Sequence, residues 1–326
     1  MKPTISIPDT DLTLAPLGLG MVKAGVRWGR TAAEADALFG AFLDCGGNLI
    51  DCAHVYADWI AVDGVHELGR AERITGQWLK RTGHRHDIIL ASKGGHPVYT
   101  NPHCDRTLLR CTPGDMRGDL EGSLELLQTD YIDIYFYHRD DPRIPVEVMV
   151  ETMEDFIREG KIRYFAVSNW TAARQMEAMA YCRKKGYRGP VADQALLNLS
   201  VPYANGLKDR TMIACTGALY TYHEARPETL LMPYSGSAGG FYHAYAAGGA
   251  EAVAGSPYAT PDNLRMAQRV VDLARQYGCS ITNVVLGYFT QLPFACLPLY
   301  GPVSVESIQD AAATFDYTFR REDYVL

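Results

Sequence analysis

The chain has 326 residues, 47% of them hydrophobic, which is enough to bury the core of one large α/β barrel or of two smaller domains. Its formal net charge is −7 without a prominent basic run, which argues against a nucleic-acid partner. Eight cysteines without a CxxC pair, no signal-peptide-like start and no membrane-length apolar segment together lead us to expect a cytoplasmic protein with reduced thiols and no membrane partner.

Strand and helix signals alternate along the chain after an N-terminal β-hairpin, which we expect within residues 1–14. The eight expected strands span residues 15–20, 47–51, 87–93, 131–137, 162–168, 190–195, 229–235 and 294–300. The expected helices begin at Thr31, a capping residue with Glu34 three positions on, and continue at 66–81, 113–127, 145–160, 171–186, 208–224, 262–277, 280–291 and from about 304. This alternation predicts parallel strands with crossover helices, in an open sheet or a closed barrel.

We favour a (β/α)8 TIM barrel in a single domain over residues 1–326, with long loops at the C-terminal mouth. An open sheet concentrates its site at one switch point, whereas here several strands end in reactive polar residues. The segment from Gly18 to Lys23 begins like a dinucleotide-binding fingerprint but lacks the third glycine. Residues 236–261 are rich in Gly, Ala and Tyr and are interpreted as a loop that can act as a lid.

The strand ends supply the chemistry. Asp51, Lys93 and His138 each follow an apolar run, and Tyr56 lies shortly after the first of them. A parallel barrel gathers these ends on one face, where active sites form. A tyrosine hydroxyl titrates near ~10, so we expect the Lys93 ammonium to lower the pKa of Tyr56, with Asp51 holding the lysine. Such a set protonates a carbonyl oxygen while a nicotinamide or similar cofactor delivers hydride.

Taken singly, each residue also fits a structural role. Asp51 is typical of a helix N-cap, Tyr56 of a packed loop aromatic, Lys93 of a paired or solvated lysine and His138 of a buried histidine. The Ser168-Asn169 pair fits a cap for the helix that follows. His and Cys residues show no regular zinc spacing, so no metal site is expected.

Four segments, in order, resemble the aldo-keto reductase superfamily. They are residues 48–56, 92–93, 137–141 and 167–170, and the resemblance extends from the hairpin to about residue 315. It implies a (β/α)8 barrel that binds NADP(H) or NAD(H) and acts on a small carbonyl or alcohol substrate. It also implies that Asp51, Tyr56, Lys93 and His138 form the catalytic tetrad.

The resemblance further implies a set of cofactor contacts. Ser168, Asn169 and Gln194 match the partners of the nicotinamide carboxamide, and Tyr234 matches the aromatic that stacks on the ring. The remaining cofactor positions that it implies are Gly20, Met21, Ser235, Ser237, Gly240, Gly301 and Ser304.

One position departs from the family pattern. Val303 stands where a Lys or Arg usually grips the adenosine 2′-phosphate, and residues 309–311 replace the usual Glu-Asn pair near the adenine. A missing cation removes a contact worth about 1.5–3 kcal/mol. The choice between NADP(H) and NAD(H) therefore stays open, and Arg320 or Arg321 is a candidate to compensate.

Substrate contacts are expected from mouth loops, with Trp28, Trp59 and His96 as candidates, although ordinary loop packing explains them equally well. Aromatic and polar groups in these loops favour a sugar or polyol. Two alternatives to an NAD(P)-dependent oxidoreductase remain: a cofactor-binding regulatory or partner-binding subunit with little turnover, and a metal-dependent barrel enzyme.

Overall fold

The computed structural model describes residues 1–100, 105, 107–204, 209 and 211–326. Its strands are β1 (Ile5–Ser6), β2 (Thr13–Leu14), β3 (Gly18–Gly20), β4 (Leu49–Asp51), β5 (Ile89–Gly94), β6 (Ile132–Tyr137), β7 (Ile162–Ser168), β8 (Ala192–Gln194), β9 (Leu230–Leu231) and β10 (Leu299–Tyr300). β1 and β2 form the expected antiparallel hairpin. The other eight strands are parallel neighbours in the order β10-β3-β4-β5-β6-β7-β8-β9.

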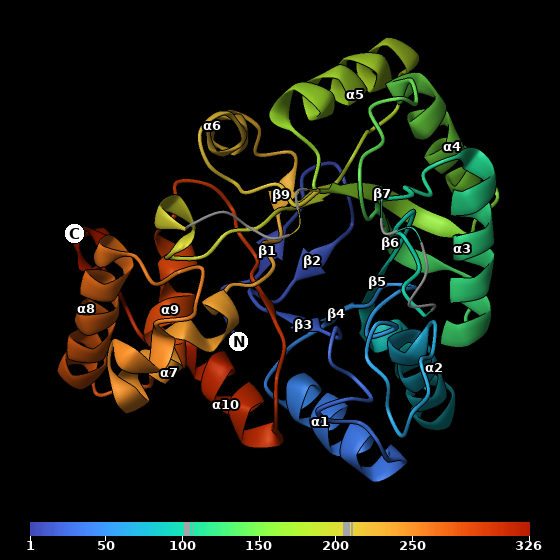
Figure 1. Cartoon of the computed structure of the whole chain (residues 1–326). Helices are drawn as coiled ribbons and strands as arrows, with labels where there is room; N and C mark the ends of the chain where they lie inside the picture. The colour runs from blue at the N-terminus through green and yellow to red at the C-terminus, as the bar shows by residue number, and fades with distance from the viewer. Residues whose placement is uncertain (101–104, 106, 205–208, 210) are drawn as a thin grey trace.

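The sheet closes on itself between β9 and β10. The seam is a parallel bridge from Leu231 to Cys296, and the Leu297 amide donates to the Leu231 carbonyl at 2.9 Å. Helices surround the strands in a ring (Figure 1). The expected (β/α)8 barrel is therefore confirmed.

The α-helices follow the strands closely. They are α1 (Ala32–Asp44), α2 (Arg70–Thr82), α3 (Pro113–Leu127), α4 (Val146–Arg158), α5 (Ala172–Lys185), α6 (Ala218–Ala225), α7 (Phe241–Gly248), α8 (Pro261–Tyr277), α9 (Ile281–Gly287) and α10 (Val305–Ala313). The Thr31 hydroxyl caps α1 by accepting from the Glu34 amide at 3.2 Å, as expected. The Glu34 carboxylate accepts from the Arg30 amide instead of completing a capping box.

The hairpin packs its apolar side chains into the base of the barrel. Ile7, Leu12 and Leu14 share one buried cluster with strand residues such as Leu49 and Phe136. The central strands β5 and β6 are almost wholly buried, as expected for parallel strands covered on both faces. The base is therefore filled, and the site must lie at the opposite end, where the strands terminate.

Two segments differ from the sequence-based expectation. The helix expected over 208–224 begins only at Ala218, and residues 208 and 210 lie outside the described ranges. Its earlier part instead extends the strand region, because the Leu196 amide donates to the Ile213 carbonyl at 2.8 Å. The 236–261 segment contains α7, which buries Phe241 and Tyr242 in a cluster shared with α8. Figure 1 shows α7 and α8 outside α9.

In the described ranges, no helix has the length and apolar character needed to cross a bilayer. Seven of the eight cysteines are free thiols there, and Cys104 lies outside those ranges.

Candidate active site

The barrel brings the strand-end residues together. Asp51 is the last residue of β4, Lys93 lies near the end of β5, and His138 directly follows β6. Tyr56 lies in the loop after β4 and turns back over the barrel, with its amide donating to the Ala53 carbonyl. Adjacent parallel strands thus deliver four reactive side chains to one mouth.

Lys93 is the centre of the cluster. Its Nζ lies 2.8 and 2.7 Å from the two carboxylate oxygens of Asp51, 2.6 Å from the Cys52 carbonyl and 2.7 Å from the Tyr56 hydroxyl. The Tyr56 hydroxyl in turn donates to Asp51 at 3.1 Å. Lys93 and Asp51 are each 1% exposed, so this is a buried ion pair with the phenol beside it.

The cluster holds Tyr56 in its protonated form. Burial, followed by the charge and hydrogen bond of Asp51, raises the pKa of Tyr56 well above its usual value. Burial lowers the pKa of Lys93, although the Asp51 carboxylate opposes that shift. The expected lowering of the Tyr56 pKa by Lys93 is therefore outweighed, because burial disfavours a phenolate and the Asp51 carboxylate repels it.

His138 is a buried neutral imidazole. Burial, then the neighbouring His96, Arg139 and Lys93, lowers the pKa of His138 well below its usual value. Its ring lies edge-on to the Tyr56 ring with centroids 5.8 Å apart, and 4.6 Å from the His96 ring. Its Nδ1 has no hydrogen-bond partner among the described residues.

A cavity of about 770 Å³ opens above this cluster. Of the predicted tetrad, Asp51, Tyr56 and His138 line it, while Lys93 lies just beneath. The predicted cofactor residues that also line it are Gly20, Ser168, Asn169, Gln194, Tyr234, Ser235, Ser237 and Gly301.

Three predicted cofactor positions do not line the cavity. Met21 is fully buried and its amide donates to the Asp51 carbonyl at 3.0 Å. Gly240 is the residue before α7, next to Gly239, which does line the cavity. Ser304 caps α10 by accepting from the Ser307 amide at 3.2 Å.

The predicted carboxamide partners are already joined by hydrogen bonds. The Asn169 side chain donates to the His138 carbonyl and accepts from the Tyr234 hydroxyl at 2.6 Å. Gln194 donates to Asp51 at 2.6 Å, which ties it to the tetrad. The helix-cap alternative for Ser168-Asn169 is wrong, because Thr171 caps α5.

The three candidate substrate residues lie in different environments. Trp59 lines the cavity and is 37% exposed, with the Lys23 ammonium 5.6 Å from its ring. His96 is buried beside His138 and its Nδ1 donates to the Pro97 carbonyl at 2.7 Å. Trp28 does not line the cavity; it packs edge-on against Phe39 in the core, because its loop folds back onto α1.

Several cavity residues were not identified from the sequence. They are Val22, Lys23, Arg139, Asp209, Met212, Gly236, Gly239 and Leu299, whereas Tyr99, which also lines the cavity, was expected among the aromatic residues of the mouth loops. Arg139 donates to Asp209 at 3.1 Å and to Thr211 at 2.8 Å. The sequence indicated Arg139 only through its position directly after His138, and nothing in the sequence linked it to Asp209, which lies 70 positions further on.

Val303 is the residue at which the sequence departs from the expected adenosine contacts. Val303 is 55% exposed, and its amide donates to the Ser307 hydroxyl at 3.0 Å. Arg320 pairs with Glu322 at 3.6 Å. Arg320, a candidate to compensate for the missing cation, thus pairs with a residue of its own C-terminal turn.

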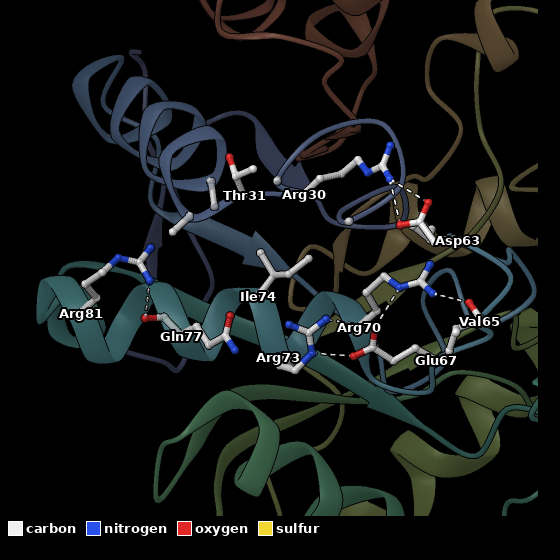
Figure 2. Close-up of a pocket in the computed structure, with 15 residues that line it drawn as sticks. Arg30, Thr31, Asp63, Val65, Glu67, Arg70, Arg73, Ile74, Gln77 and Arg81 are labelled. Atoms are coloured by element: carbon white, nitrogen blue, oxygen red, sulfur yellow. Dashed lines mark hydrogen bonds and ion pairs between the residues drawn. The ribbon is translucent and has the colours of Figure 1, made fainter.

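A second cavity of about 270 Å³ lies between α1 and α2. It is lined by the arginines Arg30, Arg70, Arg73 and Arg81. Figure 2 shows Glu67 between Arg70 and Arg73, and Asp63 opposite Arg30. Arg81 pairs with Asp36. Because every guanidinium in it already has a carboxylate partner, this cavity offers no unpaired cation for a ligand.

Comparison with known proteins gives a consistent picture. Residues 16–325 match the model of the aldo/keto reductase family. Across 96% of this chain and 91% of the relative, the sequence is 27% identical to the uncharacterized oxidoreductase YrpG of Bacillus subtilis. Aldo-keto reductase YhdN of the same organism is 31% identical over 66% of this chain and 62% of its own length.

Two further similarities bear on fold and on an alternative function. A crystal structure of the thermostable aldo-keto reductase Tm1743 with the inhibitor epalrestat superposes with a TM-score of 0.70, at 20% identity over 99% of this chain and 97% of that chain. A probable voltage-gated potassium channel subunit beta of Oryza sativa is 35% identical over 51% of this chain and 46% of its own length.

Proposed function

The chain belongs to the aldo/keto reductase family, and from that premise we propose that it is an NAD(P)-dependent oxidoreductase that interconverts a carbonyl and an alcohol. The observation that carries the proposal is the Tyr56 hydroxyl, which lines the cavity while it contacts both Lys93 and Asp51. A partly buried, protonated phenol at the floor of an open cavity is placed to donate a proton to a bound oxygen.

Several features of the cavity support a nicotinamide dinucleotide as its ligand. The loop beside it has positive φ at Ser235, Ala238, Gly239 and Gly240, from 51° to 87°. Backbone turned in this way forms concave nests of N–H groups that bind anions such as a pyrophosphate. Tyr234 supplies an aromatic ring and the Ser168-Asn169 pair supplies amide and hydroxyl groups at the same wall. When bound, the cofactor supplies the hydride.

The residues of the tetrad then divide the proton chemistry. Tyr56 donates its proton to the substrate oxygen as negative charge develops there. Lys93 stabilises the resulting phenolate through its 2.7 Å contact, and Asp51 keeps the ammonium in place. His138 is neutral, so it offers one N–H to orient the same oxygen without adding charge.

The proposed cofactor preference is argued from the residues at the expected adenosine position. Val303 provides no charge for a 2′-phosphate, and Arg320 is paired with Glu322. This supports use of NADH, with NADPH bound more weakly by the loss of one charge-assisted contact. Trp59 and Tyr99 line the same cavity as the Arg139–Asp209 pair, and this mixture of aromatic and charged groups supports a sugar-like or polyol-derived carbonyl as the substrate.

A second candidate is a cofactor-binding regulatory subunit, which the similarity to a potassium channel beta subunit supports. A pure binding role does not require the buried Lys93–Tyr56 contact, so the oxidoreductase is the better proposal.

The test compares binding with turnover. Thermal shifts with NADH and NADPH identify the preferred cofactor, and cofactor oxidation is then followed with a panel of aldehydes, ketones and sugars. We expect binding and turnover with at least one carbonyl. Tight cofactor binding with no turnover across the panel favours the regulatory subunit, and no binding of either cofactor contradicts both proposals.

A further inference from the structure

A buried carboxylate lies behind the tetrad. Glu72, on the first turn of α2, is fully buried. One oxygen accepts from the Ser92 hydroxyl at 2.5 Å, and the other contacts His54 Nδ1 at 3.1 Å. Among the described residues, no lysine or arginine pairs with it. A buried charge without compensation is strongly unfavourable, so His54 is the group that balances it.

His54 is suited to that role. Burial acts to lower the pKa of His54, but the hydrogen bond and charge of Glu72 outweigh it, so its pKa is raised. The imidazole is 8% exposed and offers its Nδ1 directly to the carboxylate. The Glu72–His54 pair therefore joins α2 to the loop after β4.

Both partners of Glu72 are close in the chain to residues of the proposed tetrad. Ser92 immediately precedes Lys93 on β5. The His54 amide donates to the Lys93 carbonyl at 3.1 Å, and Tyr56 lies two residues further on. The Gly69 amide donates to the His54 carbonyl at 2.9 Å, which anchors the start of α2 to the same loop.

We propose that Glu72 is a positioning residue, which sets the Lys93-bearing strand and the Tyr56-bearing loop against each other through Ser92 and His54. This inference rests on the proposed function and deepens it. The negative charge of Glu72 also lies behind the Lys93 ammonium and favours the charged form of that lysine. Loss of the charge should therefore disturb both the geometry and the ionisation of the tetrad.

Other polar groups near this pair are accounted for. Asp119 and Arg110 both act on His54, but they neutralise one another through an ion pair at 2.7 Å. The Cys52 thiol contacts the Thr75 hydroxyl at 3.4 Å, and burial raises the pKa of that thiol. Burial likewise raises the pKa of the nearby Tyr135 hydroxyl. Both groups are neutral, which leaves His54 as the titratable group that Glu72 contacts directly.

The test compares Glu72→Gln with the exposed control Glu125→Gln. For Glu72→Gln we expect at least a tenfold fall in kcat, cofactor affinity within twofold of the parent, and an alkaline limb of kcat shifted to lower pH. Glu72→Asp keeps the charge but shortens the side chain, so its alkaline limb should stay in place. Glu125→Gln should match the parent in every measurement.

Unchanged kcat and pH profile in a folded Glu72→Gln variant would overturn the inference. If that variant does not fold, the kcat of Ser92→Ala is measured instead. An unaltered kcat in Ser92→Ala would also overturn the inference. If the parent itself does not turn over, the proposed function has failed, and hydrogen exchange at the His54 amide takes over as the readout. Faster exchange in Glu72→Gln than in the parent supports positioning, and equal exchange overturns it.

Discussion

Lys93 shows how closely stability and chemistry are linked at the level of single residues. Among the described residues its ammonium donates four hydrogen bonds to oxygen atoms, two of which belong to Asp51, a residue as deeply buried. A buried ion pair contributes little net stability compared with an apolar pair, but removal of one partner leaves the other charge uncompensated.

Replacement of Lys93 with Met should therefore destabilise the fold by about 3–5 kcal/mol. Urea unfolding at pH 7.5 measures this change. The double variant Lys93→Met/Asp51→Asn removes both charges and should recover a large part of the loss. A single variant as stable as the parent would show that Asp51 is not held as a buried carboxylate.

The two neighbouring histidines predict a specific acid sensitivity. Burial, followed by the charge of Arg139, lowers the pKa of His96 to about 4, and the pKa of His138 is also depressed. The unfolded chain takes up these protons near pH 6.5, before the folded chain does. Both residues thus contribute stability that is present above pH 6.5 and lost as pH falls toward 4.

Melting temperatures between pH 7 and pH 5 test this effect, with His96→Gln as the comparison. The parent should lose more stability than His96→Gln over that interval. Parallel curves would contradict a neutral buried His96.

The residues that the sequence identified are those whose place follows from strand direction. Asp51, Lys93 and His138 lie at the C-terminal ends of strands, and a parallel barrel places all these ends on one face. Trp28 lies in a loop, and its inward turn onto Phe39 depends on tertiary packing that no local pattern encodes. Asp209 reaches the site through its contact with Arg139, which joins distant parts of the chain.

At the level of elements, the contact between α2 and α3 sets the position of Glu72. It depends on Gly76, because a Cβ there would lie 2.2 Å from the Leu126 carbonyl oxygen and 2.6 Å from the carbonyl carbon of Leu127. Those atoms belong to backbone, which cannot yield as a flexible side chain can. Glycine is therefore required at this crossing despite its low helix propensity.

Gly76→Ala should destabilise the protein by about 1–3 kcal/mol, as overpacking does in tight interiors. Gly118→Ala is the matched control, since its added Cβ would meet no atom within 4 Å. Alanine there should stabilise α3 by about 0.5–1 kcal/mol. Thermal unfolding of the two variants should thus shift in opposite directions, and shifts of the same sign would contradict the packing described.

Element types were predictable wherever periodicity and caps agreed, as in α3 and α5, which both begin after a capping threonine. The 236–261 segment failed that test because its many Gly and Ala residues suggested a loop. In the fold, Phe241 and Tyr242 supply enough buried surface to hold a short helix against α8.

For the molecule as a whole, the closure of the barrel is uneven. β6 and β7 are paired over most of their length, whereas the described contacts between the β9 and β10 segments are the Leu231–Cys296 bridge and two backbone hydrogen bonds, from Leu297 to Leu231 and from Leu299 to Pro233. The β9–β10 seam also lies close to the cavity, since Leu299 lines it. Fewer backbone hydrogen bonds and shorter strands lower the free energy of local opening.

Hydrogen exchange should therefore be faster at the Leu297 and Leu299 amides than at the paired amides of β6 and β7. Addition of the preferred cofactor should slow exchange at Leu299 more than in β6. Equal protection across the barrel would show that the seam is as stable as the central strands.

The central claim is that Tyr56 donates the proton to the substrate. Cofactor oxidation at saturating NAD(P)H and a reactive carbonyl, by the parent and by Tyr56→Phe, tests it most directly. Phenylalanine keeps the ring and removes the hydroxyl that Lys93 and Asp51 contact. The account predicts unchanged cofactor affinity with a rate lowered by about 10²–10⁴-fold. A Tyr56→Phe variant that oxidises the cofactor as fast as the parent would contradict it.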